Sequence, residues 1–137
     1  MAKLNYVELP VGNLPASLDF FAAVFGWTLK PFGPSYAATL TGATDVGLQG
    51  DPAAQTKAPL PVIEVDDLAA ALAAVERAGG AVTRPIFNFP GGARFHFREP
   101  SGLELAVWMS TSQWDGPEDQ MFLGEKKSGY RSQPETI

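Results

Sequence analysis

Residues 6–31 read YVELPVGNLPASLDFFAAVFGWTLKP, and residues 60–85 read LPVIEVDDLAAALAAVERAGGAVTRP. The second stretch repeats the first at an offset of 54 residues. The identical pairs are Val11/Val65, Leu14/Leu68, Ala16/Ala70, Leu18/Leu72, Gly26/Gly80 and Pro31/Pro85, and Asn13 is replaced by Asp67. Repeated segments of this length build the same supersecondary unit twice. The sequence therefore predicts two tandem modules.

Each copy contains one predicted helix. The apolar positions of the first are Leu14, Leu18, Phe21 and Phe25, and those of the second are Leu68, Leu72 and Val75. Residues three or four positions apart share one face of a helix, so both segments are amphipathic. Asn13 and Asp67 can cap the first-turn amides, and Gly26 and Gly80 stand where a left-handed residue ends a helix.

Strands are expected around each helix. In the first copy they are 6–9, 27–30, 36–41 and 46–49, and in the second 62–65, 81–84, 93–98 and 103–109. Pro31 and Pro85 are expected to end the strands that follow the helices, because proline cannot donate to the ladder. The order strand, helix, strand, strand, strand occurs twice, which makes the fold class α+β. We expect one domain over residues 1–112, with module one at 4–50, a linker at 51–59, module two at 60–112, and a C-terminal tail at 113–137.

The composition narrows the chemistry. The chain has 137 residues, weighs 14.6 kDa, and contains no cysteine and one histidine, His96. Disulfide frameworks, thiolate nucleophiles and metal sites with several imidazoles are therefore excluded. A net charge of -5 without a basic run argues against nucleic acid as a partner, and no apolar run approaches the roughly 18 residues of a membrane span. We expect a cytoplasmic protein that binds neither nucleic acid nor membranes.

Four motifs, YVELPVGNL at 6–14, FF at 20–21 before VFGW at 24–27, VDDL at 65–68 and FREPSGLEL at 97–105, occur in this order. Through them residues 5–110 resemble the vicinal-oxygen-chelate superfamily, which includes glyoxalase I, extradiol dioxygenases and bleomycin- and fosfomycin-resistance proteins. The resemblance implies two βαβββ modules that form a curved mixed sheet around a concave cleft. It specifies the fold rather than the reaction, because members of this superfamily do different chemistry on one scaffold.

The same resemblance implies a metal held by one residue of the first strand and one of the fourth strand of each module, usually His or Glu. The corresponding positions are Tyr6, Val46 or Leu48, Leu60 or a neighbour, and Glu104. Only Glu104 is a good ligand, since aliphatic side chains offer no donor and tyrosine is protonated at neutral pH. We expect no metal or other cofactor. The alternative is a divalent metal at the family's metal site, with Glu104 as a ligand.

Strand alternation indicates which side chains face the cleft, because successive residues point to opposite faces. In 103–109, Leu105, Val107 and Met109 should pack under the helices, which leaves Glu104 and Trp108 in the cleft. A concave site with aromatic walls and a few polar groups is typical of small-molecule binding. The candidate ligand-binding residues are Tyr6, Glu8, Trp27, Tyr36, Phe87, Arg94, His96, Glu104 and Trp108, and the candidate catalytic residues are Glu104 and His96.

Each candidate also has a structural interpretation. Glu104 could pair with Arg94 or Arg98 on the neighbouring strand, and His96 could be a hydrogen-bonded strand residue without a part in chemistry. If Glu8 and Glu104 face each other in a dry cleft, their repulsion would favour a general base. The aromatic residues either pack in the core and rim or stack on a planar or cationic ligand.

The function expected first is metal-independent binding of a planar or cationic small molecule in an aromatic, acidic cleft, as in the drug-sequestering resistance proteins of this superfamily. The alternative is a glyoxalase-related lyase or isomerase, or a dioxygenase-like enzyme, that uses Glu104 as base or metal ligand. A third hypothesis is that the cleft is vestigial and that the protein acts only through a surface that binds a partner. We expect a homodimer, with the tail at 113–137 across the subunit interface or the cleft mouth, or ordered only by crystal packing.

Overall fold

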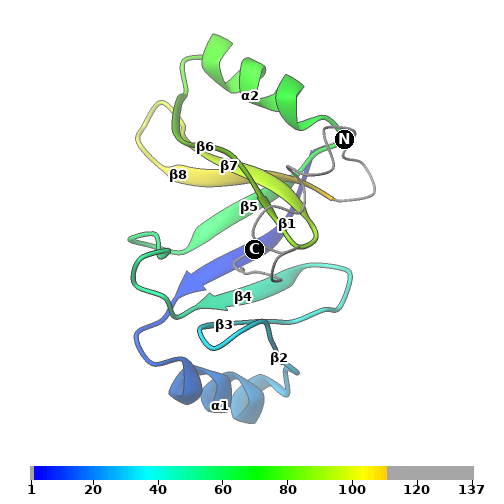
Figure 1. Cartoon of the computed structure of the whole chain (residues 1–137), viewed down its shortest axis with the longest axis vertical. Coiled ribbons are helices and arrows are strands. Elements are labelled where there is room, and N and C mark those ends of the chain that lie inside the picture. Colours follow the sequence, from blue (N-terminus) through cyan, green and yellow to red (C-terminus); the bar gives the residue numbers. More distant parts are fainter. Residues whose placement is uncertain (1, 111–137) are drawn as a thin grey trace.

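The computed structural model describes residues 2–110 of the chain, and the tail expected at 113–137 lies outside the described residues. The described part contains eight strands and two helices (Figure 1). In chain order the elements are β1 (Lys3–Pro10), α1 (Leu14–Phe25), β2 (Lys30–Pro31), β3 (Tyr36–Ala38), β4 (Asp45–Gln49), β5 (Leu60–Glu64), α2 (Leu68–Arg77), β6 (Ala81–Phe89), β7 (Gly92–Arg98) and β8 (Glu104–Ser110). The eight strands form one sheet in the order β2-β3-β4-β1-β5-β8-β7-β6.

Strands β1 and β5 join the two modules at the centre of this sheet. Within each module the first strand pairs in parallel with the fourth, β1 with β4 and β5 with β8. β1 and β5 pair antiparallel with each other, so both modules of one chain share a single sheet. The sheet curves between α1 at one end and α2 at the other (Figure 1). The expected α+β fold of two βαβββ modules is therefore confirmed.

Helix α2 covers the half of the sheet formed by module two. Its first residue, Leu68, is 1% exposed and belongs to a core cluster with Phe95, Val107 and Met109. Full burial of each such side chain stabilises the fold by about 1.5–3 kcal/mol. Asp67 caps the helix as predicted, since its Oδ1 accepts a hydrogen bond from the backbone N–H of Ala70 at 3.0 Å.

Glycines end both helices, although only one of them at the predicted residue. Gly26 has a φ of 70° and donates its N–H to the carbonyl of Ala22 at 2.9 Å. After α2 the left-handed residue is Gly79, with a φ of 96°, so the prediction of Gly80 was wrong by one position. Gly80 is required by space instead, because a Cβ there would lie 2.7 Å from Val75 Cγ1.

Helix α1 is covered less than its sequence predicted. None of its residues is fully buried. Phe25, which we placed on the apolar face, is 59% exposed, and Phe20 and Val24 are similarly exposed. Phe21 stacks on Trp27 with ring centroids 5.2 Å apart. The prediction of a single apolar face therefore fails to give a buried face at the C-terminal end of this helix, where Phe25 contacts the rings of Phe21 and Trp27 and remains mostly exposed.

The strands that follow the helices differ from their predicted limits. β6 continues through Pro85 to Phe89, although we expected Pro85 to end it. It is an edge strand whose pairing with β7 shifts register between Val82 and Arg84 and again between Arg84 and Phe87. A residue without an N–H is tolerated at such a position. β2 is shorter than predicted and contains only Lys30 and Pro31.

The two faces of the sheet differ in character. Phe95, Val107 and Met109 face α2, as strand alternation predicted. The prediction was wrong for Leu105, which is not part of this cluster and lines a pocket instead. The opposite face, here called the concave face, carries a small apolar cluster of Leu60, Val62 and Ala106. It also carries a row of polar and aromatic side chains: Tyr6, Glu8, Tyr36, Phe87, Arg94, His96, Glu104 and Trp108. Neither helix in residues 2–110 is long and apolar enough to cross a membrane.

Candidate functional site

A buried ion pair links the two modules across the concave face. Arg94 Nη1 donates to Glu8 Oε1 at 3.2 Å, and Nη2 donates to Oε2 at 3.3 Å. Both side chains are 2% exposed. Glu8 belongs to β1 and Arg94 to β7. A single charge buried in this way is strongly unfavourable, so each of the two residues needs the opposite charge of the other to be stable in the folded chain.

Two tyrosines extend this network within module one. The hydroxyl of Tyr36 donates to Glu8 Oε1 at 3.0 Å, and the hydroxyls of Tyr6 and Tyr36 share a short hydrogen bond. Burial, together with the negative charge of Glu8, raises the pKa of both phenols well above the usual value, so both remain protonated. Gly47 of β4 makes the space for them, since a Cβ there would lie 2.0 Å from the Tyr36 hydroxyl and 2.1 Å from that of Tyr6.

The position of β4 corrects one sequence prediction. Gly47 pairs with Glu8 in the parallel ladder, so Gly47 shares the concave face with it. Val46 and Leu48, which we placed at the metal position of this strand, alternate with Gly47 and therefore point to the helix side. The prediction was wrong by one residue, because a strand of five residues without a clear polar–apolar alternation does not reveal which face each residue takes.

The residues at the family's metal positions do not fit a divalent ion. The two phenol hydroxyls fill the space beside Gly47, and Leu60 in β5 offers no donor. Asp45, at the start of β4, accepts hydrogen bonds from Thr39 Oγ1 and from the amides of Thr41 and Gly42, so it serves the loop before the strand. In the described residues no group of three or more His, Cys, Asp or Glu side chains could hold a metal.

A second polar group, the His96–Glu104 pair, lies on module two. His96 Nδ1 is 3.2 Å from Glu104 Oε2, and the Thr83 hydroxyl donates to the same oxygen at 3.2 Å. The sequence left Arg94 and Arg98 as partners for Glu104, but the structure gives it His96 and Thr83. Glu8 and Glu104 therefore have different hydrogen-bond partners and do not form a pair of facing carboxylates.

The imidazole of His96 is neutral at physiological pH. Burial, with the positive charges of Arg94 and Arg84 nearby, lowers the pKa of His96 to about 3. A neutral ring beside a carboxylate carries its proton on the nitrogen that faces the carboxylate, which here is Nδ1. Nε2 is then an acceptor, and among the described residues it has no hydrogen-bond partner. Glu104 therefore fixes the tautomer and the orientation of this ring.

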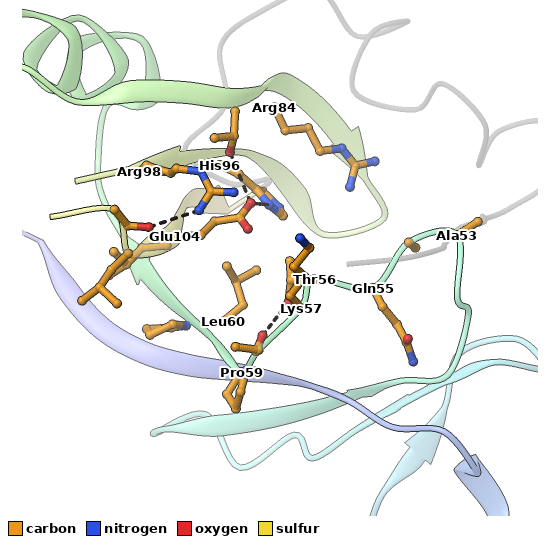
Figure 2. A pocket seen from close by; sticks show the side chains of 17 residues that line it. Ala53, Gln55, Thr56, Lys57, Pro59, Leu60, Arg84, His96, Arg98 and Glu104 are labelled. Carbon is orange, nitrogen blue, oxygen red and sulfur yellow. Dashed lines mark hydrogen bonds and ion pairs between the residues drawn. The ribbon is translucent and has the colours of Figure 1, made fainter. Parts of the chain in front are cut away.

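A pocket of about 800 Å³ adjoins this pair. It is bordered by the linker between the modules, by β5, and by β6, β7 and β8, with His96 and Glu104 in its wall (Figure 2). Leu60, Leu103 and Leu105 give it apolar surface. Its charged lining consists of Lys57, Arg84, Arg98 and Glu104, which corrects our expectation of an acidic cleft. The lining thus contains three cations and one carboxylate.

Phe87 stacks against the cations above the pocket. The guanidinium carbon of Arg84 lies 3.8 Å from the centroid of the Phe87 ring, and that of Arg94 lies 5.3 Å from it. The ring of His96 is 5.8 Å away, centroid to centroid. Such cation–aromatic contacts hold a guanidinium in a defined plane. Phe87 thus positions charged groups instead of offering its face to a ligand.

The structure brings most of the predicted site residues to one face, but only His96 and Glu104 line the pocket. Trp108 lies on the concave face with its indole N–H bonded to Asn5 Oδ1 at 3.2 Å, beside the Phe89 ring. Trp27 is not at this site. It follows the C-terminus of α1 and packs on that helix, so its assignment to the cleft was wrong.

The pocket residues that the sequence did not predict include Lys57, Thr83 and Arg84. Thr83 and Arg84 are neighbours in β6 and would point to opposite faces of a regular strand. The register shift between Val82 and Arg84 brings both into the lining. Pro85 was the available signal, since a proline inside a strand marks an edge or a bulge. Lys57 comes from the linker, whose composition gave no indication of it.

The family comparison agrees with this architecture. Residues 3–107 match the model of the Glyoxalase/Bleomycin resistance protein/Dioxygenase superfamily, and the chain belongs to this family. The resemblance inferred from the four sequence motifs is therefore confirmed. No curated protein matches the chain.

Solved structures share the fold at low sequence identity. A superfamily member from Vibrio splendidus 12B01 has a TM-score of 0.62 and 16% identity over 80% of this chain and 100% of its own. Methylmalonyl-CoA epimerase from Mycobacterium tuberculosis has a TM-score of 0.63 and 12% identity, covering 79% of this chain and 87% of that one. The Mn(II)-bound glyoxalase from Novosphingobium aromaticivorans has a TM-score of 0.60 and 22% identity, covering 80% and 40%. These similarities show the fold alone.

Proposed function

We propose that this protein binds a small organic molecule, without a metal, in the pocket beside the His96–Glu104 pair. The observation that carries the proposal is a cavity of about 800 Å³ with an oriented imidazole and carboxylate in its wall. Small-molecule sites are commonly concavities of about 300–1,000 Å³ with apolar walls and a few convergent polar groups. Binding alone would suffice for a sequestering role of the kind found among resistance proteins.

A pocket-filling substitution tests this proposal. Ala58→Trp adds an indole at an exposed lining position, and Ala69→Trp adds the same group on an exposed position of α2, outside the pocket. In ¹H–¹⁵N spectra, a fragment library should shift amides of residues 55–58, 83–84 and 96 in the wild-type chain and in the Ala69→Trp variant. The Ala58→Trp variant should lose these shifts. Fragments that leave these amides unmoved, or that bind both variants equally, would refute the proposal.

The metal-independent part of the proposal has its own test. Because Glu104 is the single good ligand at the family's metal positions, where Tyr6 is a hydrogen-bonded phenol and Leu60 is aliphatic, protein purified without chelator should contain no stoichiometric divalent metal. Elemental analysis measures this directly. One equivalent of bound metal that resists dialysis would contradict it.

One observation favours an enzyme as the second candidate. The Glu104 side chain is 23% exposed at the pocket, and its Oε2 is held by His96 and Thr83. A carboxylate fixed in this way can remove a proton from a bound carbon acid, as lyases and isomerases require. Once a ligand is identified, incubation in D₂O should label it in the wild type and not in the Glu104→Gln variant. Binding without label would leave only the sequestering function.

We also propose that the chain forms a homodimer through α1. A helix that is apolar on most sides is usually buried, and α1 carries a single charged residue, Asp19. Phe20, Val24 and Phe25 are each more than half exposed. Sedimentation should give a dimer for the wild type and a monomer for the Phe20→Ser/Phe25→Ser variant. A wild-type monomer at high concentration would exclude this interface.

A further inference from the structure

Arg84 is a cation without a carboxylate partner. It lies between the two register shifts of β6, exposed at the pocket, with its guanidinium stacked on Phe87 at 3.8 Å. Among the described residues, its guanidinium makes neither a hydrogen bond nor an ion pair. Burial of part of the group and the positive charge of Arg94 lower the pKa of Arg84 by more than the charges of Glu8 and Glu104 raise it, so these carboxylates compensate its charge only in part. An anion beside it would supply that compensation.

The neighbouring carboxylates are already engaged. Both oxygens of Glu8 accept hydrogen bonds from Arg94. Glu104 Oε2 accepts from Thr83 and faces His96. Neither carboxylate bonds to Arg84, so the guanidinium keeps its donors for a molecule that enters the pocket.

The pocket as a whole is positive in a chain that is negative. Lys57, Arg84 and Arg98 oppose Glu104 on its lining, which gives a net charge of about +2 with His96 neutral, against -5 for the whole chain. Arg98 donates to the carbonyl of Gly102 at 3.1 Å and is thus partly engaged. Lys57 is exposed on the linker and extends into the space across from Arg84 (Figure 2).

We infer that the ligand of this pocket is an organic acid whose carboxylate is bound by Arg84 with Lys57. This inference rests on the proposed function, because it names the class of molecule that the pocket takes. A guanidinium held flat on an aromatic ring offers two parallel N–H donors, which match the two oxygens of a carboxylate. The rest of the ligand would lie along Leu60 and Leu105, and a hydroxyl or amino group on it could donate to Glu104.

Four probes that share one ring system test the charge preference: 2-naphthoate, 2-naphthyl phosphate, 2-naphthamide and 2-naphthamidine. Each is titrated into the full chain at low ionic strength, with the amides of residues 55–58, 83–84 and 96 as readout. We expect 2-naphthoate to bind at least tenfold more tightly than the amide and the amidine. Tighter binding of the phosphate would overturn the assignment to carboxylates, and preference for the amidine would overturn an anionic ligand altogether.

Variants of Arg84 locate the effect. Arg84→Gln should weaken 2-naphthoate at least tenfold, whereas Arg84→Lys should retain part of the affinity because it retains the charge. Arg77→Gln is the control, since Arg77 is an exposed arginine at the end of α2, outside the pocket. Equal affinity of the Arg84→Gln variant and the wild type would overturn the inference. If none of the four probes moves a pocket amide, the proposed function itself fails, which is a different result from a wrong charge preference.

Discussion

Removal of Arg94 should destabilise the fold more than removal of any exposed charge. Arg94→Leu leaves the Glu8 carboxylate in a site where its side chain is 2% exposed, with the Tyr36 hydroxyl as its remaining donor. Breaking a buried pair by deleting one partner costs about 3–5 kcal/mol. For a domain whose total stability is about 5–15 kcal/mol, this is a large share. The midpoint of thermal unfolding should fall by about 10–20 °C.

A double substitution separates the ion pair from general disruption. Glu8→Leu/Arg94→Leu removes both charges together, so it should be clearly more stable than the Arg94→Leu variant. Urea unfolding followed by circular dichroism measures both, and Arg77→Leu serves as the exposed control, expected within about 0.5 kcal/mol of the wild type. A loss below about 1 kcal/mol in the Arg94→Leu variant, or a double variant no more stable than it, would refute the coupling between Glu8 and Arg94.

Three further predictions concern packing, capping and pH. Gly47→Ala should cost about 1–3 kcal/mol in unfolding free energy because its Cβ would overlap both tyrosine hydroxyls, whereas Gly12→Ala, which meets no atom within 4 Å, should be nearly neutral. Asp67→Ala should cost about 1 kcal/mol through loss of the α2 cap, as read by urea unfolding. His96 is the only histidine, and its pKa is about 3 in the folded chain against 6.5 in the unfolded chain. Between these two pH values the unfolded state binds more protons than the folded state. The free energy of unfolding therefore falls as the pH decreases through this window. The slope due to this group should reach at most about 1.4 kcal/mol per pH unit and be absent from the His96→Gln variant; parallel curves for both proteins would show that burial does not hold the imidazole neutral.

The sequence predicted the module order because caps, apolar spacing and helix-ending glycines coincide in both copies. It also predicted the faces of β7 and β8, where large apolar residues alternate with charged ones: Phe95 and Val107 face α2, and His96 and Glu104 face the pocket. When large apolar and charged residues alternate regularly along a strand, only one assignment of its two faces buries the apolar side chains.

Local irregularities account for most of what the sequence did not predict. β4 has five residues with glycine at its centre, so the choice between Gly47 and its neighbours required the tyrosines of two other strands. β6 shifts register at two places, which brought Arg84 to the pocket. The alternation of side chains along a strand could not predict that Lys57 lines the pocket, because this depends on where the linker lies. It could not predict that Glu8 pairs with Arg94 either, because this depends on how the two modules lie against each other.

A crystal structure of the full chain with bound 2-naphthoate tests the central claim most directly, because it shows where in the protein an organic acid binds. Our account predicts density in the pocket beside the His96–Glu104 pair, with the carboxylate about 3 Å from the guanidinium of Arg84 and no metal at Glu104. Density for the ligand away from this pocket, or a metal bridging it to Glu104, would contradict the account.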